Sequence, residues 1–249
     1  MSVPVFHAPR ADLLAGPQVV LAGTEGRHAA VVRRIGVGEH VVLTDGAGVA
    51  VDGVVALVER ERLVVDVVAV SEHARPQPAV TVVQALPKGD RAEQAVETLT
   101  EVGVDRIVPW AASRSVARWR DERGAKALER WRTTAREAAK QSRRTWWPEV
   151  LPLVGSESVA TLAASASLAL VLHEQAAAPI ADVSVPADGD VLLVVGPEGG
   201  VAPAELAAFE AAGARSVHLG PTVLRTSTAG AVAVGALLAP TARWRASGP

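Results

Sequence analysis

The sequence predicts an α/β protein with two domains, a small N-terminal β-barrel and a larger C-terminal domain on a parallel sheet. Two observations predict the larger domain. Short runs of Val and Leu, such as residues 191–195, end at glycine-rich turns, and each turn leads into an Ala-rich helix. In residues 1–72, by contrast, short apolar runs alternate with Gly and Asp-Gly turns, a spacing typical of a barrel.

Composition narrows the class of protein. The chain has 249 residues and is 49% hydrophobic. No apolar run approaches the ~18 residues of a membrane span, and the first residues lack a signal-peptide pattern. The chain has no cysteine, which excludes disulfides and thiolate metal sites. We therefore expect a cytoplasmic protein that binds neither membrane nor metal.

The charge is unevenly distributed. The formal net charge is −2, yet residues 114–147 hold eleven Lys or Arg and four Asp or Glu, a surplus of seven positive charges. A basic segment in a mildly acidic chain predicts a local anionic partner.

The N-terminal domain is expected to contain strands at residues 19–21, 41–43, 54–57 and 63–70, and one helix at 25–34. Asp45-Gly46 and Asp52-Gly53 are predicted turns between strands. One side of this domain is expected to be basic, with Arg10, Arg27, His28, Arg33 and Arg34. This side is either an RNA-binding surface or ordinary solvated surface. Two prolines in residues 75–78 predict a linker, which gives domains at 1–74 and 78–249.

After the linker, a strand at 80–86, a helix at 91–102 capped by Asp90 and a strand from Ile107 predict a β-α-β unit of a parallel sheet. Lys88 and Arg91 follow the first strand beside a glycine. This position favours phosphate binding over plain solvation.

A long helix at 125–142 follows. Its apolar stripe is Leu128, Trp131, Ala135, Ala138 and Ala139. On another face Arg132, Arg136 and Lys140 recur every four residues, followed by Arg143 and Arg144. Like charges at this spacing repel, and a phosphate backbone would explain them. Trp119, Trp131, Trp146 and Trp147 lie in this basic segment, and some of them could stack on bases. Trp131 belongs to the core stripe, whereas Trp146 and Trp147 are open between core packing and stacking.

The last third of the chain repeats the strand-turn-helix pattern. A weak helix at 160–169 is followed by a strand at 168–172, which ends at His173-Glu174; with no HExxH, we do not predict a metal here. The strand at 191–195 ends in a Gly-Pro-Glu-Gly-Gly turn before a helix that opens at Pro203, with Glu205 near its positive end. A strand at 217–219 leads to a helix that begins near Arg225. The turns after these strands fall on one sheet edge, where ligands bind in open α/β folds.

These features exclude some chemistries. The Gly-Pro-Glu-Gly-Gly turn is not GxGxxG, and no Walker lysine follows, so a dinucleotide or NTP site is poorly supported. An enzyme that acts on nucleic acid with a small cofactor fits the remaining features, and so does a non-catalytic RNA-binding protein.

Several long motifs carry a resemblance. They begin at His28 (HAAVVRRIGVGEHVVLTDGAG), Gln84 (QALPKGDRAEQAVETLTEVGVD), Arg130 (RWRTTAREAAKQSRRTWWPEV), Gly196 (GPEGG) and Leu219 (LGPTVLRTSTA). In this order they resemble the RsmE family of ribosomal RNA uridine methyltransferases, in the SPOUT superfamily. The resemblance implies a PUA-like N-terminal β-barrel and a SPOUT domain whose chain threads a trefoil knot.

The resemblance also implies a function: a homodimer that uses S-adenosylmethionine to methylate N3 of one uridine in 16S ribosomal RNA of the 30S subunit. The alternatives are a non-catalytic ribosome-assembly factor on the same fold and a SPOUT enzyme acting on tRNA. The implied cofactor-binding residues are Leu172, His173, Glu174, Gly196, Pro197, Glu198, Gly199, Gly200, Leu219, Gly220, Val223, Leu224 and Arg225.

Catalysis is assigned to two of these positions. Arg225 would stabilise the uracil as its N3 proton leaves, and Glu198 or Glu174 would place the base or accept that proton. The RNA-binding residues are expected to be Arg10, Arg27, His28, Arg33, Arg34, Lys88, Arg91, Arg114, Arg132, Arg136, Lys140, Arg143 and Arg144. Thr98, Ser113, Thr222 and Ser227 depart from the residues frequent in the family, so no substrate or base role is carried over to them.

Overall fold

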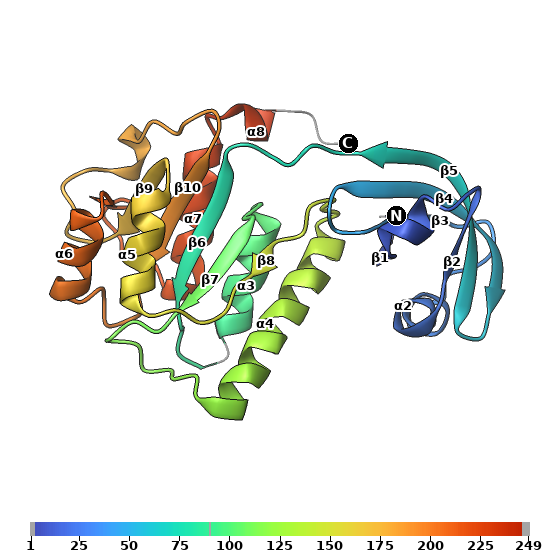
Figure 1. Ribbon diagram of the computed structural model, residues 1–249, viewed down its shortest axis with the longest axis horizontal. Helices are drawn as coiled ribbons and strands as arrows, with labels where there is room; N and C mark the ends of the chain where they lie inside the picture. The colour runs from blue at the N-terminus through green and yellow to red at the C-terminus, as the bar shows by residue number, and fades with distance from the viewer. Residues whose placement is uncertain (1–2, 90, 246–249) are drawn as a thin grey trace. The chain divides into compact units, whose positions relative to one another are not determined.

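The computed structural model describes residues 3–89 and 91–245 (Figure 1). The chain divides into two compact units. Residues 1–75 and 139–147 form the first, and residues 76–138 and 148–249 form the second. The segment 139–147, expected within the C-terminal domain, therefore groups with the N-terminal unit.

The first unit is built on one five-stranded sheet. In spatial order its strands are β1 (Val5–His7), β3 (His40–Thr44), β4 (Val49–Glu59), β5 (Arg62–Glu72) and β2 (Gln18–Leu21). The first pair is parallel and the other pairs are antiparallel. Short helical segments accompany the sheet, namely α1 (Arg10–Leu13), α2 (Gly23–Arg27) and the π-helix η1 (His28–Val32).

Two sequence expectations in this unit need correction. The helix expected at 25–34 divides into α2 and η1. Asp52-Gly53 is not a turn, because it lies inside β4 where the pairing register shifts. A β-carbon on Gly53 would approach Val65 Cγ1 to 2.3 Å. The glycine therefore permits a close strand crossing at a bulge, which sequence alone does not distinguish from a turn.

The segment 139–147 completes the first unit with two tryptophans. Trp146 donates its indole N–H to the His73 carbonyl at 2.9 Å and covers Gly48, where a β-carbon would lie 2.7 Å from the ring. Trp147 packs on Gly46 in the same way. Both half-buried side chains hold the β3–β4 turn, so packing accounts for them without base stacking.

The second unit is built on a six-stranded sheet in which every pair is parallel. In spatial order the strands are β11 (Arg215–Val217), β9 (Leu168–Leu172), β10 (Asp190–Val195), β6 (Ala79–Ala85), β7 (Arg106–Trp110) and β8 (Glu149–Val150). The helical segments are α3 (Arg91–Glu101), α4 (Asp121–Gln141), α5 (Ser156–Ser165), η2 (Ile180–Asp182), α6 (Pro203–Ala211), α7 (Thr226–Leu238) and α8 (Ala242–Arg245). The predicted cap at Asp90 lies outside the described residues.

Alternate side chains of each central strand fill two separate cores. In β10, Leu193 packs with residues of α3, α4 and α7, whereas Leu192 and Val194 pack with residues of α5 and α6. A strand buried on both faces is apolar at most positions, which explains the unbroken Val and Leu run of β10. Trp131 lies in the first core, and its ring centre is 5.0 Å from that of Trp119. The knot implied by the resemblance concerns how the chain threads and stays a prediction.

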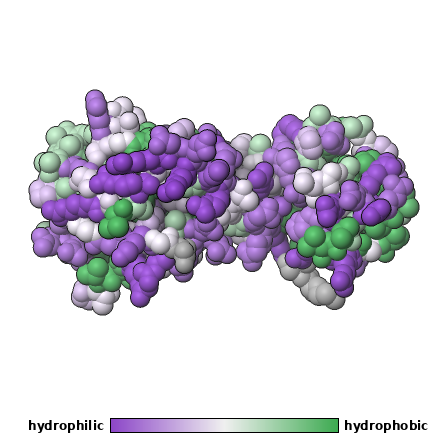
Figure 2. Space-filling view, turned by 90° about the horizontal axis from the view of Figure 1, so that it is seen from below, coloured by the Kyte–Doolittle hydropathy of each residue, from purple (hydrophilic) through white to green (hydrophobic). Residues whose placement is uncertain are grey.

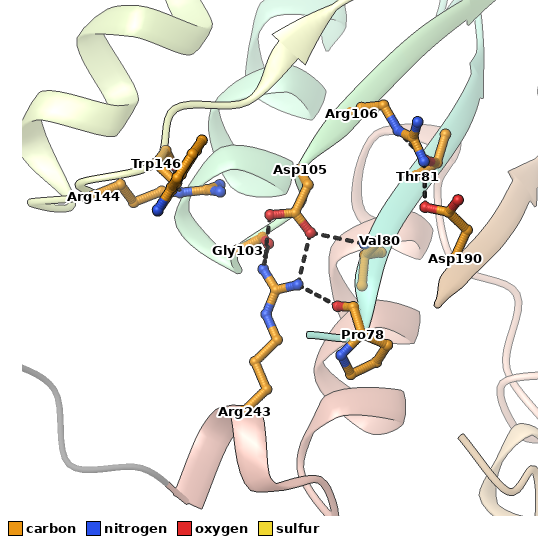
Figure 3. A network of polar contacts seen from close by, with 10 residues as sticks. All are labelled: Pro78, Val80, Thr81, Gly103, Asp105, Arg106, Arg144, Trp146, Asp190 and Arg243. Atoms are coloured by element: carbon orange, nitrogen blue, oxygen red, sulfur yellow. Dashed lines mark hydrogen bonds and ion pairs between the residues drawn. The ribbon is translucent and has the colours of Figure 1, made fainter. Parts of the chain in front are cut away.

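A buried ion pair fastens α8 to the amino-terminal edge of this sheet (Figure 3). Arg243 donates to the Asp105 carboxylate at 2.7 Å and to the carbonyls of Pro78 and Gly103. Asp105 also accepts from the Val80 N–H at 2.7 Å. The side chains of Arg243 and Asp105 are 7% and 2% exposed, so each charge depends on the other.

Candidate functional site

The carboxyl ends of the parallel strands bring the glycine turns to one edge of the second unit. The predicted cofactor loops follow β9, β10 and β11, and the loops with Lys88 and Arg114 follow β6 and β7. Figure 2, seen from below, looks toward this edge, and hydrophilic side chains cover much of it. A site is expected here because parallel strands leave a crevice at their carboxyl ends.

The loops after β9 and β11 are held together by backbone hydrogen bonds. His173 N–H donates to the Val217 carbonyl at 2.9 Å, and Ile180 N–H donates to the His218 carbonyl at the same distance. Nδ1 of His218 accepts from the Gly220 N–H at 3.0 Å. Gly220 has φ +117°, and a β-carbon there would meet nothing within 4 Å, so open space adjoins this backbone.

The turn at 196–200 is held from two sides. The carboxylate of Glu198 accepts from the Lys88 N–H at 3.2 Å, in the loop after β6. The guanidinium of Arg114 donates to the Gly199 carbonyl at 3.2 Å, in the loop after β7. A β-carbon on Gly199 would lie 3.2 Å from Arg114 Cβ, a tight contact, so the glycine favours this close approach.

Glu205 joins three segments at the same edge. Its carboxylate accepts from the Ser113 N–H at 2.9 Å, the Ser113 hydroxyl at 3.1 Å, the Ser156 hydroxyl at 2.7 Å and the Ala202 N–H at 3.2 Å. Burial acts to raise the pKa of Glu205, but these hydrogen bonds to the ionised carboxylate outweigh burial and hold the pKa below its ordinary value. Glu205 is therefore an ionised anchor for the loop after β7.

The start of α7 presents one free cation and a buried polar atom. Arg225 is the N-cap residue, and its carbonyl accepts from the N–H groups of Thr228 and Ala229 at 2.9 Å. Its exposed guanidinium forms no ion pair within residues 3–89 and 91–245. Ser227 Oγ and Gln84 Oε1 are buried and have no hydrogen-bond partner in that part of the chain. Buried polar atoms that lack a partner in the fold are expected where a ligand or water binds.

The predicted RNA-binding residues of the second unit have different surroundings. Lys88, Arg91 and Arg136 are exposed. Arg132, in contrast, donates to Glu129 at 2.6 Å and to the Val150 carbonyl at 3.3 Å. The fold therefore accounts for the charge of Arg132 without a phosphate.

In the first unit, some of the predicted RNA-binding cations are exposed and others are paired within the fold. Arg33 and Arg34 are exposed after η1 and form no ion pair with other described residues, whereas Arg10 pairs with Asp45 and Glu72. Lys140 is 6% exposed and pairs with Glu25 at 3.0 Å, so it is not available to RNA in this structure. The remaining positions also have neighbours: Arg27 approaches Glu61, His28 packs on Phe6, Arg143 lies in a turn, and Arg144 donates to the Trp146 carbonyl.

The four positions that depart from the family pattern are also placed. Thr98 bonds back to the carbonyls of Gln94 and Ala95, and Thr222 is exposed. Ser113 binds Glu205 and Ser227 is buried, as described above. The role of Glu205 could be predicted only as far as its place in the first turn of α6, because its partners Ser113 and Ser156 are 92 and 49 residues away.

The carboxyl edge of the parallel sheet thus carries the glycine turns, and the first unit is a five-stranded sheet with short helical segments. A family model described as an RNA methyltransferase domain matches residues 74–238, and one described as an RNA methyltransferase PUA domain matches residues 21–68. These matches confirm the α/β SPOUT-type domain and the PUA-like domain expected from the resemblance.

Comparison with individual relatives identifies the family more closely. The chain is 48% identical to ribosomal RNA small subunit methyltransferase E of Mycobacterium bovis, over 93% of this chain and 90% of that protein. It is 28% identical to the Bacillus subtilis protein of the same name, over 89% and 90%. A crystal structure of the Neisseria gonorrhoeae enzyme bound to S-adenosylmethionine matches with TM-score 0.83, at 28% identity over 96% and 98%. The chain belongs to the ribosomal RNA small subunit methyltransferase E family.

Proposed function

We propose that this protein transfers the methyl group of S-adenosylmethionine to N3 of one uridine in 16S ribosomal RNA of the small subunit. The observation that carries the proposal is the arrangement at the carboxyl edge of the sheet. The loops after β9, β10 and β11 follow adjacent strands, and the exposed guanidinium of Arg225, which has no ion-pair partner among the described residues, lies on the last of these loops. The methyl donor needs a pocket, and the uracil that loses a proton needs a nearby cation.

The residues present fit the cofactor. Gly220 borders open space, and Gly200 has φ +71°, so backbone at both turns can approach a ligand closely. The buried oxygens of Ser227 and Gln84, which lack a hydrogen-bond partner among the described residues, supply hydrogen-bonding groups near the start of α7. When bound, S-adenosylmethionine supplies an electrophilic methyl group on its sulfonium. The cofactor-binding residues are those carried over from the resemblance, Leu172–Glu174, Gly196–Gly200, Leu219–Gly220 and Val223–Arg225.

The substrate must lose a proton from N3, which is a weak acid in uracil. Arg225 stabilises the developing negative charge on the base, because an arginine without an internal partner keeps its full charge for the ligand. Glu198 or Glu174 places the base or accepts the proton. Glu198 already accepts from the Lys88 N–H, whereas Glu174 is exposed and makes no ion pair with the described residues. Comparing Glu174→Gln with Glu198→Gln in turnover assays separates the two roles.

We also propose that the protein is a homodimer of the cytoplasm. The exposed side of α7 is apolar, with Val232 48% exposed, which suits burial against a second copy. Light scattering after size exclusion tests the dimer, and a single monomer peak would contradict it. Within the described residues, no helix has the length and apolarity needed to cross a membrane.

The deciding experiment offers three substrates to the purified protein with labelled S-adenosylmethionine. These are 30S subunits from a strain without the modification, free 16S RNA and total tRNA. We expect 3-methyluridine, identified by mass spectrometry, in 16S RNA. Label in tRNA alone would indicate a tRNA enzyme. Cofactor binding without transfer to any RNA, or no cofactor binding by calorimetry, would favour a non-catalytic assembly factor.

A further inference from the structure

The loop that follows β7 has a regular alternation of exposed and less exposed side chains. At residues 113–120, here called the arginine ridge, the outward positions are Arg114, Val116, Arg118 and Arg120, all exposed. Val116 is 67% exposed, among the most exposed large apolar side chains in the described chain. The ridge contains no acidic residue. Exposure therefore alternates along residues 114–120, because Ser115 is buried and Ala117 and Trp119 are half-buried between the exposed positions.

The inward positions fix the ridge to the protein. Ser115 is 4% exposed, and Ala117 packs against the core. The Trp119 ring meets Trp131 edge-on at 5.0 Å, and a β-carbon on Gly124 would lie 3.1 Å from Trp119. Because the inner side chains are anchored, the outer ones are held in place without further ordering on binding.

The ridge begins at the candidate site. Glu205 holds the backbone and hydroxyl of Ser113, and Arg114 reaches the Gly199 carbonyl in the cofactor turn. Arg118 donates to the Ser113 carbonyl at 3.5 Å, and neither Arg118 nor Arg120 forms an ion pair with the described residues. Two exposed guanidinium groups and one exposed valine therefore lie along the surface next to the candidate site.

We propose that the arginine ridge is the docking strip for the single-stranded RNA segment that carries the target base. Three exposed arginines, Arg114, Arg118 and Arg120, lie close together in the chain and can meet phosphates of one strand. Arginine binds phosphate with paired donors, and an apolar side chain between two arginines offers contact to a base.

A single strand fits better than a duplex. This inference rests on the proposed function, because N3 of uridine lies on the Watson–Crick edge and its proton is engaged in every paired uridine. An enzyme that methylates N3 must therefore receive an unpaired or extruded base. A rigid strip beside the cofactor turn would guide the unpaired strand so that its base enters the site.

The test measures RNA affinity, not methyl transfer, so its failure is distinct from failure of the proposed function. Arg118→Gln/Arg120→Gln is compared with the control Arg215→Gln/Arg245→Gln, which removes the same charge. Arg215 begins β11 and Arg245 ends α8, so both lie away from the loop edge. The probe is a short fluorescein-labelled oligouridylate, followed by anisotropy between about 50 and 200 mM KCl.

We expect the ridge variant to bind roughly tenfold more weakly at low salt than the wild type and the control. Its dependence of log K on log salt should fall by roughly 1.4, from about 0.7 per phosphate contact on single strands. Val116→Ser should weaken binding about two- to threefold without changing the salt dependence. Thermal midpoints and S-adenosylmethionine affinity should be unchanged.

Three results would overturn the proposal. The first is a ridge variant that binds the oligouridylate as the control does. The second is a wild-type protein with no measurable affinity for this probe. The third is an equal loss of affinity for a blunt RNA duplex of the same length, because that would indicate phosphate attraction without preference for a single strand.

Discussion

Two basic stretches that follow each other in the chain differ in how their charges are used. The row along α4 was expected to bind phosphate, yet Arg132 bonds to Glu129 and a carbonyl, and Lys140 is buried on Glu25. In the arginine ridge, Arg118 and Arg120 point outward with no acidic partner among the described residues. The number of basic residues in a segment therefore does not give the number of cations that can bind a ligand. The fold decides which cations are paired with acidic groups and which remain available.

Arg243 and Arg225 differ in the same way, because Arg243 forms an ion pair inside the fold whereas Arg225 is available to a ligand. Arg243→Ala removes one partner of a buried pair and leaves Asp105 charged at 2% exposure. We expect the free energy of unfolding to fall by about 3–5 kcal/mol, measured by urea denaturation. Arg245→Ala on the same helix is the control and should change stability by less than about 0.5 kcal/mol. A loss below about 1 kcal/mol for Arg243→Ala would contradict the anchoring role.

Arg225→Ala should act on turnover instead of stability. Loss of the cation that stabilises the uracil should lower kcat by about 10²–10³, while calorimetry shows S-adenosylmethionine affinity within about threefold of wild type. The unfolding midpoint should not change, because the side chain has no ion-pair partner among the described residues. Unchanged kcat would exclude this role for Arg225.

The carboxylate of Glu205 is bonded inside the fold, and its contribution to the free energy of unfolding should depend on pH. Because its pKa is lowered in the folded state, its stabilisation is fully present above the unfolded pKa of about 4.3 and is lost as pH falls through the folded pKa. Glu205→Gln should lose about 2 kcal/mol at neutral pH, the scale of hydrogen bonds to a charged group.

The difference between wild type and Glu205→Gln should therefore shrink below about pH 4.3, as measured by thermal unfolding from neutral to acid pH. Glu210→Gln is the control, since Glu210 is exposed on the same helix and bonds only to Ser216 among the described residues. A constant difference across the whole pH range would show that the charge of Glu205 does not contribute.

The smallest effect sharpens the comparison within α4 itself. Arg136 is exposed with no ion pair among the described residues, so Arg136→Gln should weaken oligouridylate binding about twofold and lower its salt dependence by roughly 0.7. Lys140→Gln should lower the unfolding midpoint and leave RNA affinity unchanged. The reverse pattern would mean that burial of Lys140 does not decide its role.

Much of the fold could be predicted because its causes are local. The apolar run before the turn at 196–200 became β10, the run at 168–172 became β9, and the apolar stripe with Trp131 became the buried side of α4. Periodicity also indicated which strand ends carry the glycine turns. Asp52-Gly53 was misread because a glycine at a bulge and a glycine in a turn have the same local signature.

By itself the sequence determined the strand-turn-helix order, the placement of the glycine turns after parallel strands and the family of the chain, because these depend on patterns of neighbouring residues. Only the tertiary structure decided that Glu205 anchors Ser113, that Trp146 and Trp147 pack on the β3–β4 turn, and that Lys140 forms a buried ion pair with Glu25. Each of these contacts joins residues far apart in the chain. Burial and pairing arise from such contacts, and they set whether a polar side chain supports the fold or meets a ligand.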